Sequence, residues 1–184
     1  MSEPAPGSAP VVRRATEQDC PALLALYNHA VLTTTATWDL DTVDLDDRRA
    51  WLRTHNTGRH VTLVAESAGE VVGYAGYGPF RGKAGWDDTV EHSVYLSPTA
   101  QGRGLGTRLL RELIAAAREH RIHVMVGVLS SENEVSVRLH RALGFVEVAR
   151  MPQVGHKFGR WLDAVMLQLI LDERVRPAEA DREE

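Results

Sequence analysis

The stretch Thr89–Ala117 constrains the fold more than any other part of the sequence. It begins with TVEHSVYL, a run of β-branched and aromatic residues that predicts a strand. SPTAQGRG follows, and its proline and glycines are typical of a tight loop. From Leu105 onward, apolar residues recur at the 3.6-residue spacing of an amphipathic helix. We therefore expect a strand that leads through a glycine-rich loop into a helix.

This loop has the properties of an anion-binding site. The first N–H groups of a helix have no partners inside the helix, and the helix dipole places partial positive charge there. Gly102 and Gly104 allow close approach to the backbone because they lack a Cβ atom, and Arg103 adds a full positive charge. A phosphate or pyrophosphate is the expected ligand. The alternative is a tight strand-to-helix turn that binds nothing.

Two common phosphate-binding motifs do not fit this loop. A P-loop ends in Gly-Lys-Ser/Thr, but here the corresponding residues are Gly-Leu-Gly-Thr. A dinucleotide motif needs a third glycine where this chain has Thr107. The segment Gln101–Gly106 does fit the pattern Gln/Arg-x-x-Gly-x-Gly/Ala. In this it resembles the pyrophosphate loop of the Gcn5-related N-acetyltransferases (GNAT), which hold acetyl-CoA.

Composition bounds the class of protein. The chain has 184 residues, of which 43% are hydrophobic and 25% charged, values that predict one soluble globular domain. A net charge of −4 argues against a general nucleic-acid surface, and no apolar run approaches the length of a membrane span. The single cysteine, Cys20, excludes an intrachain disulfide and fits a reducing cytoplasm.

The ends of the chain differ from its middle. Residues 1–10 lack the basic and apolar regions of a signal peptide and predict a disordered lead. Residues 11–172 are expected to form the single domain, and residues 173–184 a charged, solvated tail.

The predicted elements follow the order βααβββαβαββ, which indicates a mixed sheet with helices on both faces. Helices are expected after a Thr16 N-cap, over Asp46–Thr54, from Leu105, and from a Ser131/Glu134 capping box to Gly144. Loops are expected over 78–88 and 151–161. Strands are expected at Val11–Arg14, Val61–Glu66, Glu70–Tyr77, Thr89–Leu96, His123–Leu129, Val146–Ala149 and Asp163–Leu169.

The second half strengthens the resemblance. Asn133 and His140-Arg-Ala-Leu-Gly-Phe145 are similar to the Asn-x₆-Tyr-x₃-Gly-Phe pattern of the GNAT family. TTTATW, TVEHSVYL, HVMVGVL, SVRLHRALGF and MPQVGHKFGRWLD resemble the phosphinothricin and methionine sulfone/sulfoximine N-acetyltransferases, so the likeness covers roughly Val11 to Asp172. That subgroup also has histidine where His140 replaces the tyrosine of many relatives, which puts the usual tyrosine general acid in doubt.

The resemblance implies a fold and an activity. The fold would be the α/β (α+β) GNAT fold, a central, mixed, mostly antiparallel twisted sheet of six to seven strands with helices on both faces. The activity would be transfer of an acetyl group from acetyl-CoA to the α-amine of a small amino-acid analogue, without a metal. The subgroup is typically a homodimer, in which the segment 152–161 could reach a partner's site.

Acetyl transfer needs a base for the amine, because an α-amine is mostly protonated near neutral pH. Glu91 is the candidate, since it shares a strand face with Thr89 and Ser93, and a carboxylate there is costly without a role or a partner. A salt-bridged structural glutamate is the alternative. The resemblance favours the base, acting directly or through water.

The cofactor would be held mainly by backbone groups. The resemblance implies that N–H groups of Val94, Tyr95 and Leu96 meet the thioester carbonyl and the pantetheine arm. Asn133 would bind the same arm, or simply begin a helix. His140 would steady the leaving thiolate or touch the substrate, or be a structural histidine. The expected pyrophosphate loop comprises Gly102, Arg103, Gly104, Leu105, Gly106 and Thr107.

The anionic end of an amino-acid acceptor needs an arginine or lysine. Arg81, beside Phe80 and just before the strand that carries Glu91, is the best candidate. Further candidates for the acceptor site are Trp38, Trp86, Thr89 and Lys157, although either tryptophan could be a core residue. No metal site is expected, because His120-x-x-His123 runs from a helix end into a strand.

Two other functions stay open at this point. A protein Nα- or Nε-acetyltransferase would share the fold but need an open groove, whereas FRGKAGW and TTTATW favour a closed pocket. A CoA-binding sensor without catalysis would not need Glu91.

Overall fold

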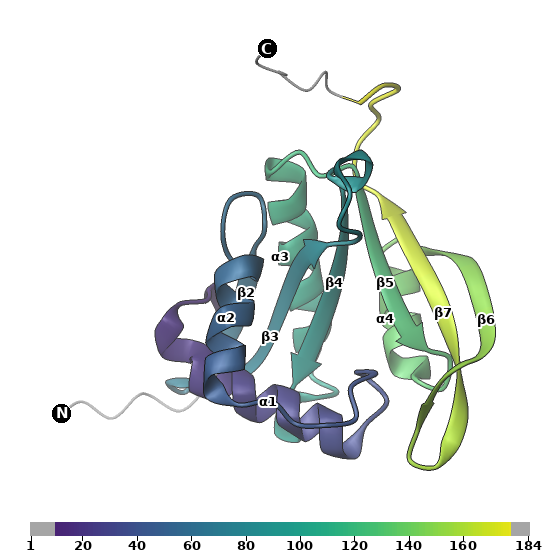
Figure 1. Cartoon of the computed structure of the whole chain (residues 1–184). Coiled ribbons are helices and arrows are strands. Elements are labelled where there is room, and N and C mark those ends of the chain that lie inside the picture. The colour runs from purple at the N-terminus through teal and green to yellow at the C-terminus, as the bar shows by residue number, and fades with distance from the viewer. Residues whose placement is uncertain (1–9, 178–184) are drawn as a thin grey trace.

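A computed structural model of the chain describes residues 10–177. It contains four α-helices and seven strands in the expected order (Figure 1). Most of the predicted lead and tail, residues 1–9 and 178–184, lies outside the described residues. The helices are α1 (Cys20–Thr33), α2 (Leu45–His55), α3 (Leu105–Glu119) and α4 (Glu134–Ala142). The strands are β1 (Val11–Arg14), β2 (Thr62–Ser67), β3 (Glu70–Pro79), β4 (Thr89–Leu96), β5 (Val124–Ser130), β6 (Val146–Lys157) and β7 (Arg160–Ile170).

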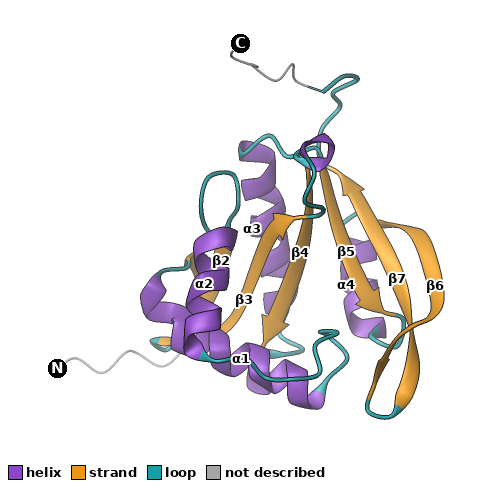
Figure 2. Cartoon of the chain, viewed as in Figure 1, coloured by secondary structure: helices purple, strands orange, loops and turns teal. Residues whose placement is uncertain are grey.

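The strands form one sheet in the order β1-β2-β3-β4-β5-β7-β6. Only β4 and β5 run parallel, and every other neighbouring pair is antiparallel. Helices α1 and α2 lie on one face of the sheet, and α3 and α4 lie on the other (Figures 1 and 2). The expected mixed, mostly antiparallel sheet with helices on both faces is confirmed.

Each face of the sheet has its own hydrophobic core. Alternate residues of a strand point to opposite faces, so Tyr74 and Tyr95 pack under α1, whereas Tyr77 and Val90 pack under α3. The apolar stripe of α3 is fully inside the second core, as its 3.6-residue spacing requires. The central strand β4 therefore presents one set of side chains to α1 and α2 and another to α3 and α4.

The first helix begins later than the sequence predicts. Thr16, its expected N-cap, precedes a short 3₁₀ turn, Glu17–Asp19, and α1 itself begins at Cys20 with Asp19 as the N-cap residue. The Asp19 carboxylate accepts hydrogen bonds from the Thr16 backbone N–H and hydroxyl at 2.7 and 3.1 Å. α2 begins at Leu45, one residue before the expected Asp46. Asp44 caps α2 by accepting from the Asp47 N–H at 2.9 Å. Such caps are worth about 1 kcal/mol each because they satisfy N–H groups that the helix leaves free.

The start of α4 differs from the prediction. The helix begins at Glu134, with Asn133 as the N-cap whose side-chain oxygen accepts from the Ser136 N–H at 3.1 Å. The expected Ser131/Glu134 capping box is therefore wrong by two residues, because an asparagine next to the first helical residue supplies the same oxygen. The end is as expected: Gly144 follows the helix with a left-handed φ of 92°.

The segment 151–161 is not the loop that its proline and glycines predict. β6 continues to Lys157 and returns as β7 through a two-residue Phe158-Gly159 turn, both residues with positive φ. β6 is an edge strand, where proline can be accommodated. The pairing with β7 shifts register between Met151 and Gly155, and this irregularity absorbs the residues that break the pattern.

Candidate active site

The parallel strands β4 and β5 separate in the middle of the sheet. They pair only over Thr89–Glu91 and Val124–Val126, whereas β4 stays paired with β3 as far as Leu96. Beyond Glu91, the edge of β4 that faces β5 is free of strand partners, and Figure 1 shows the two ribbons diverging. Val94, Tyr95 and Leu96 lie in this open part, where an elongated ligand can bind the exposed backbone.

The glycine loop lies between the end of β4 and the start of α3. Gly102 and Gly104 both have left-handed φ angles, 73° and 75°, which a side chain disfavours. The space where their Cβ atoms would stand is open to 4 Å, and no side chain caps α3. The free N–H groups of the helix are thus available to an anion, with Arg103 exposed beside them.

Gly106 lies deeper, where an added Cβ would stand 3.2 and 3.3 Å from side chains of Leu139 and Leu96. The small residue lets α3 approach the sheet and α4 closely. Leu105 is buried and Thr107 half-buried in this first turn of the helix. The loop thus has the open backbone and the positive charge that the sequence analysis expected of an anion site.

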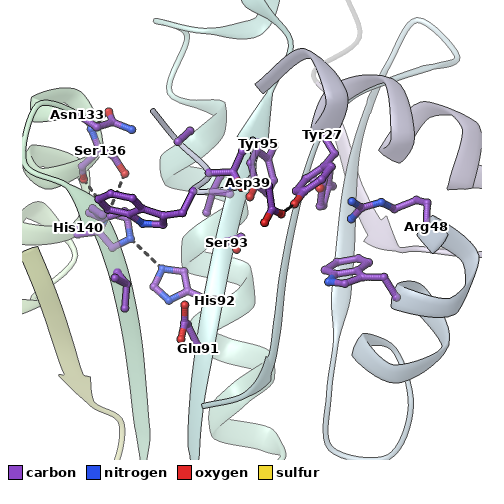
Figure 3. Close-up of a pocket in the computed structure, with 18 residues that line it drawn as sticks. Tyr27, Asp39, Arg48, Glu91, His92, Ser93, Tyr95, Asn133, Ser136 and His140 are labelled. Atoms are coloured by element: carbon purple, nitrogen blue, oxygen red, sulfur yellow. Dashed lines mark hydrogen bonds between the residues drawn. The ribbon is translucent and has the colours of Figure 1, made fainter. Parts of the chain in front are cut away.

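A cavity of about 290 Å³ opens where β4 leaves β5 (Figure 3). It continues toward α1 and α2, so a single space joins the strand gap to the opposite face of the sheet. Its lining comprises Tyr27, Ala36, Thr37, Trp38, Asp39, Arg48, Trp51, Tyr74, Glu91, His92, Ser93, Val94, Tyr95, Val128, Leu129, Asn133, Ser136 and His140. Of the predicted site residues, the structure brings together Glu91, Val94, Tyr95, Asn133, His140 and Trp38 in this cavity.

Glu91 stands on the cavity wall at the last residue where β4 and β5 pair. Within the described residues it has no hydrogen-bond or ion-pair partner, so it is not the salt-bridged glutamate of the alternative interpretation. The side chain is solvent-exposed by area, but the protein atoms packed around it raise the pKa of its carboxyl group by desolvation. The charge of Arg81 opposes this rise. Glu91 thus combines access with a raised pKa, which suits a base.

His92 and His140 form a buried pair at the point where the strands part (Figure 3). Their Nε2 atoms are 2.8 Å apart, and the pair packs on Phe145. Each Nδ1 atom faces a backbone carbonyl oxygen, that of Val126 at 2.8 Å and that of Ser136 at 2.7 Å. Because a carbonyl only accepts, both Nδ1 atoms must carry the ring proton.

The two Nε2 atoms can then hydrogen-bond only if one additional proton lies between them. Burial opposes charging: it lowers the pKa of His140, and it lowers the pKa of His92 to about 3 with repulsion from His140 as the second cause. The pair therefore takes up a proton, on His140 first, only below the ordinary pKa of histidine, and it resists a second. On β5, Gly127 leaves room for both rings, since its Cβ would stand 3.0 and 3.3 Å from them.

The other end of the cavity contains residues that the sequence analysis missed. The Arg48 side chain comes from α2, and its Cζ lies 3.9 Å from the ring centre of Tyr27 and 4.9 Å from that of Trp51. The Tyr27 hydroxyl donates to the Asp39 carboxylate. The sequence carries only a weak signal: Arg48 has the helical spacing of Leu45 and Leu52, and the structure shows that Arg48 and Leu52 are the two buried residues of α2.

Arg81 and its neighbours lie beside this cavity and not in it. Arg81, Trp86 and Thr89 line an adjacent hollow of about 390 Å³. The Arg81 guanidinium lies 4.9 Å from the ring centre of Phe80, which packs edge-on against Trp86. Arg81 is nevertheless close enough to Glu91 for its charge to lower the pKa of the Glu91 carboxyl group.

Lys157 is also outside the cavity lining. It is 2% exposed and donates to the carbonyl of Thr37 at 2.9 Å. Two residues earlier, a Cβ on Gly155 would stand 2.6 Å from the ring of Trp38. The β6–β7 hairpin therefore holds the 34–39 segment in place as a cavity wall, and Lys157 contacts that segment from behind.

Within residues 10–177, no group of three or more histidine, cysteine, aspartate or glutamate side chains is placed to hold a metal. No helix in the same part of the chain is both long and apolar enough to cross a membrane.

The sequence matches the profile of the acetyltransferase (GNAT) family over residues 23–145. It is 51% identical over 166 residues to an L-amino acid N-acyltransferase of Escherichia coli (strain K12), covering 90% of this chain and 96% of the relative. It is 50% identical over 166 residues to the L-methionine sulfoximine/L-methionine sulfone acetyltransferase of Salmonella typhimurium, covering 90% and 97%.

A solved structure shows the same fold with a ligand. The phosphinothricin acetyltransferase of Sinorhizobium meliloti, in complex with acetyl-CoA, superimposes with a TM-score of 0.89 at 32% identity, covering 93% of this chain and 94% of that one.

Proposed function

This chain belongs to the GNAT acetyltransferase family and is an N-acetyltransferase with acetyl-CoA as cosubstrate, and from this premise we propose that its acceptor is a small amino-acid analogue. The acceptor class is that of methionine sulfone, methionine sulfoximine and phosphinothricin, acetylated on the α-amine. The observation that carries the proposal is the single cavity of about 290 Å³ that contains both Glu91 and the open edge of β4. Relatives named for these substrates support it.

The cofactor site would follow the gap between β4 and β5. The glycine loop, Gly102–Thr107, would hold the pyrophosphate at the start of α3, with Arg103 as an additional cation. Backbone N–H groups of Val94 and Leu96, which point away from β3, would bind the pantetheine arm and the thioester carbonyl, where preorganised donors stabilise the oxyanion as the amine attacks. The intervening Tyr95 points its backbone N–H toward β3, as Ser97 does, so it would line the arm without donating to it. Asn133 would contact the same arm while capping α4.

Glu91 would act as the general base, directly or through a water molecule. The acceptor amine would lie near the Glu91 carboxylate and attack the thioester carbonyl within the ternary complex. Burial raises the pKa of the Glu91 carboxyl group toward the operating pH, and a base is most effective when its pKa lies near that pH. Arg81, on the other side of Glu91, would bind the α-carboxylate of the acceptor, with Phe80, Trp86 and Thr89 around it.

His140 would serve the leaving thiolate. When the pair has taken up its one proton, that proton could pass from His140 to the thiolate sulfur as the C–S bond breaks. His92 would then be a positioning residue, because it acts on His140 and does not touch the substrate. Trp38 would cover the acceptor, and Lys157 would hold the wall segment that carries Trp38.

We also propose a homodimer in the cytoplasm. Val154, Phe158 and Trp161 of the β6–β7 hairpin are 52%, 53% and 65% exposed, so this tip offers apolar surface to a second copy. The compartment rests on Cys20, a buried free thiol.

The acceptor is tested by a screen that detects free CoA thiol. Methionine sulfone, methionine sulfoximine, phosphinothricin, the common amino acids and an N-terminal peptide should be compared at equal concentration. The proposal expects the three analogues to have the highest kcat/KM. Preference for the peptide would instead indicate a protein N-acetyltransferase, and thiol release with none of them would indicate an acceptor outside this set.

The base is tested by Glu91→Gln, which keeps the shape of the side chain and removes its basicity. Loss of a general base typically costs about 10²–10⁴-fold, so kcat should fall by that range near neutral pH while acetyl-CoA still binds. Part of the rate should return at higher pH, where more amine is already neutral. Glu70→Gln, an exposed glutamate at the start of β3, is the matched control. Wild-type kcat across pH 6–9 in Glu91→Gln would contradict the role.

A further inference from the structure

Arg48 is a buried cation without an anion. Its side chain is 4% exposed, and its Nε atom has no hydrogen-bond partner. Within residues 10–177, the Arg48 guanidinium makes no hydrogen bond or salt bridge, although it lines the cavity. A buried charge normally needs a paired group, since the loss of hydration is costly.

The aromatic rings around Arg48 compensate for only part of this cost. Its Cζ lies 3.9 Å from the ring centre of Tyr27, a cation–π contact, and Trp51 offers a second ring at 4.9 Å. These rings fix the plane of the guanidinium but accept no hydrogen bonds at its edge. The Tyr74 hydroxyl, another buried group that lines the same cavity, also has no partner. Two unsatisfied donors thus belong to one wall.

The neighbouring arginine shows what an ordinary surface position looks like. Arg49 is 45% exposed and pairs with Asp46 at 3.0 Å on the outer side of α2. Arg48, one residue earlier, instead occupies the buried face with Leu52. Arg49 is therefore a matched control for the charge of α2.

The position of Arg48 indicates which part of a ligand it meets. Figure 3 shows Glu91 beside His92 at one end of the cavity and Arg48 beside Tyr27 at the other. In keeping with this, the charge of Arg81 lowers the pKa of Glu91, whereas that of Arg48 lowers the pKa of Tyr74 and Tyr95. An amino-acid acceptor has its amine and α-carboxylate on one carbon, so both lie near Glu91 and Arg81. Arg48 lies further along the cavity, where it would meet the end of the acceptor's side chain.

We propose that Arg48 and Tyr74 bind the oxygen atoms at the side-chain end of the acceptor. A sulfone or phosphinate presents two oxygens on one atom, and a planar guanidinium can donate two parallel hydrogen bonds to such a group. Arg48 is then the residue that distinguishes oxygenated acceptors from thioethers and alkyl chains. The inference rests on the acceptor class proposed above.

The test compares methionine sulfone with methionine and norleucine in wild type, Arg48→Met and Arg49→Met. A hydrogen bond to a charged group is worth roughly 10- to 150-fold, so Arg48→Met should lower kcat/KM for the sulfone by that factor. Methionine and norleucine, which lack the oxygens, should change by no more than about 3-fold. Arg49→Met should leave all three unchanged, and the KM for acetyl-CoA should not move.

A uniform loss on all three acceptors would overturn the proposal, because Arg48 would then bind the α-carboxylate or only support the fold. Tyr74→Phe guards against misfolding of Arg48→Met, since it removes one hydroxyl that has no partner. It should lower the sulfone kcat/KM by about 2- to 10-fold, the effect of one neutral hydrogen bond, and spare norleucine.

If wild type acetylates no acceptor, the proposed function fails. Binding of side-chain oxygens by Arg48 and Tyr74 is then judged by fragment binding alone. The probes are dimethyl sulfone and dimethylphosphinate, titrated into the acetyl-CoA complex and followed by NMR. Binding to wild type and to Arg49→Met but not to Arg48→Met supports the site. Equal binding to all three proteins, or binding to none, overturns it.

Discussion

The two ends of the cavity are built in different ways. The end proposed for the cofactor uses one continuous stretch, β4, the glycine loop and α3, together with α4 immediately after β5. The end proposed for the acceptor combines α1, the 34–39 segment, α2, β3 and, from behind, the β6–β7 hairpin. Residues that cooperate there, such as Thr37 and Lys157, are 120 positions apart in the chain.

The proposed assignment of the two ends would explain how a GNAT enzyme can keep its cofactor and change its acceptor. The cofactor end offers mainly backbone groups, which any sequence with the right turns supplies. The acceptor end offers side chains such as Arg48 and Trp38, which can be exchanged without altering the sheet. Variants at one end should therefore change the binding of one ligand and leave the other unaffected. Because His92 and His140 lie between the two ends, variants of this pair should change the stability of the fold around both.

The largest expected effect comes from this histidine pair. The pKa of His92 is about 3 in the folded protein, below the ordinary 6.5 of the unfolded chain. Between these values the unfolded state binds more protons than the folded state, so the free energy of unfolding falls as the pH drops. At full effect this is on the order of 4–5 kcal/mol, and it is absent above about pH 6.5.

His92→Phe should remove part of this acid sensitivity, since the ring is similar in size and packs on Phe145. Urea unfolding at intervals from pH 8 to pH 4 measures the difference. The variant should lose less stability than wild type over that range, although its stability at pH 8 is lower. Parallel curves for the two proteins would mean that His92 takes up a proton freely in the folded state.

The fold was largely predictable because its signals are local. Strand alternation, the stripe of α3 and glycines at turns all act within a few residues, and the order of elements followed from them. The prediction failed at β6, where Pro152 and Gly155 look like loop residues. An edge strand with an irregular register tolerates them, and only pairing with β7 reveals this.

The geometry of the candidate site was predictable to the extent that it is made of backbone. The glycine loop and the position of Glu91 follow from one stretch, whereas Arg48, Tyr27 and Asp39 meet only after α1 and α2 pack on the sheet. No local pattern ties Arg48 to Tyr27, and an arginine on a helix usually faces solvent. The clue is that Arg48 lies on the same face of the helix as Leu52, but the sequence alone does not show how far the buried face extends.

The cofactor end is tested by Gly104→Asp. Acetyl-CoA at 100 times its Kd should stabilise wild type by about 2.7 kcal/mol through mass action, seen as a rise in Tm. A carboxylate at the start of α3 repels the pyrophosphate and should abolish this rise. Gly104→Asn is the control, because asparagine tolerates the left-handed φ of 75° and carries no charge. Equal stabilisation of wild type and Gly104→Asp would mean that this loop does not bind the pyrophosphate.

Arg81→Ala tests the binding of the α-carboxylate, the group that all amino-acid acceptors share. If Arg81 binds the α-carboxylate, the KM should rise for every amino acid, with or without side-chain oxygens, by roughly 10- to 150-fold. The Kd of acetyl-CoA should stay the same, as measured by the Tm shift. If Arg81→Ala weakened only the binding of acetyl-CoA, the 78–88 loop would belong to the cofactor end. The proposed separation of cofactor and acceptor ends would then be wrong.

The smallest effect is expected where the hairpin supports the acceptor wall. Gly155→Ala places a methyl group where the Trp38 ring lies 2.6 Å away, so either the ring or the hairpin must move. Overpacking of this kind costs about 1 kcal/mol at the mild end, and because Trp38 lines the cavity the strain should appear as a several-fold higher acceptor KM. Gly85→Ala, where a Cβ has open space, is the matched control. If Gly155→Ala altered only the Tm and left the acceptor KM unchanged, the hairpin would support the fold without shaping the site, and acceptor choice would rest on α1, α2 and β3 alone.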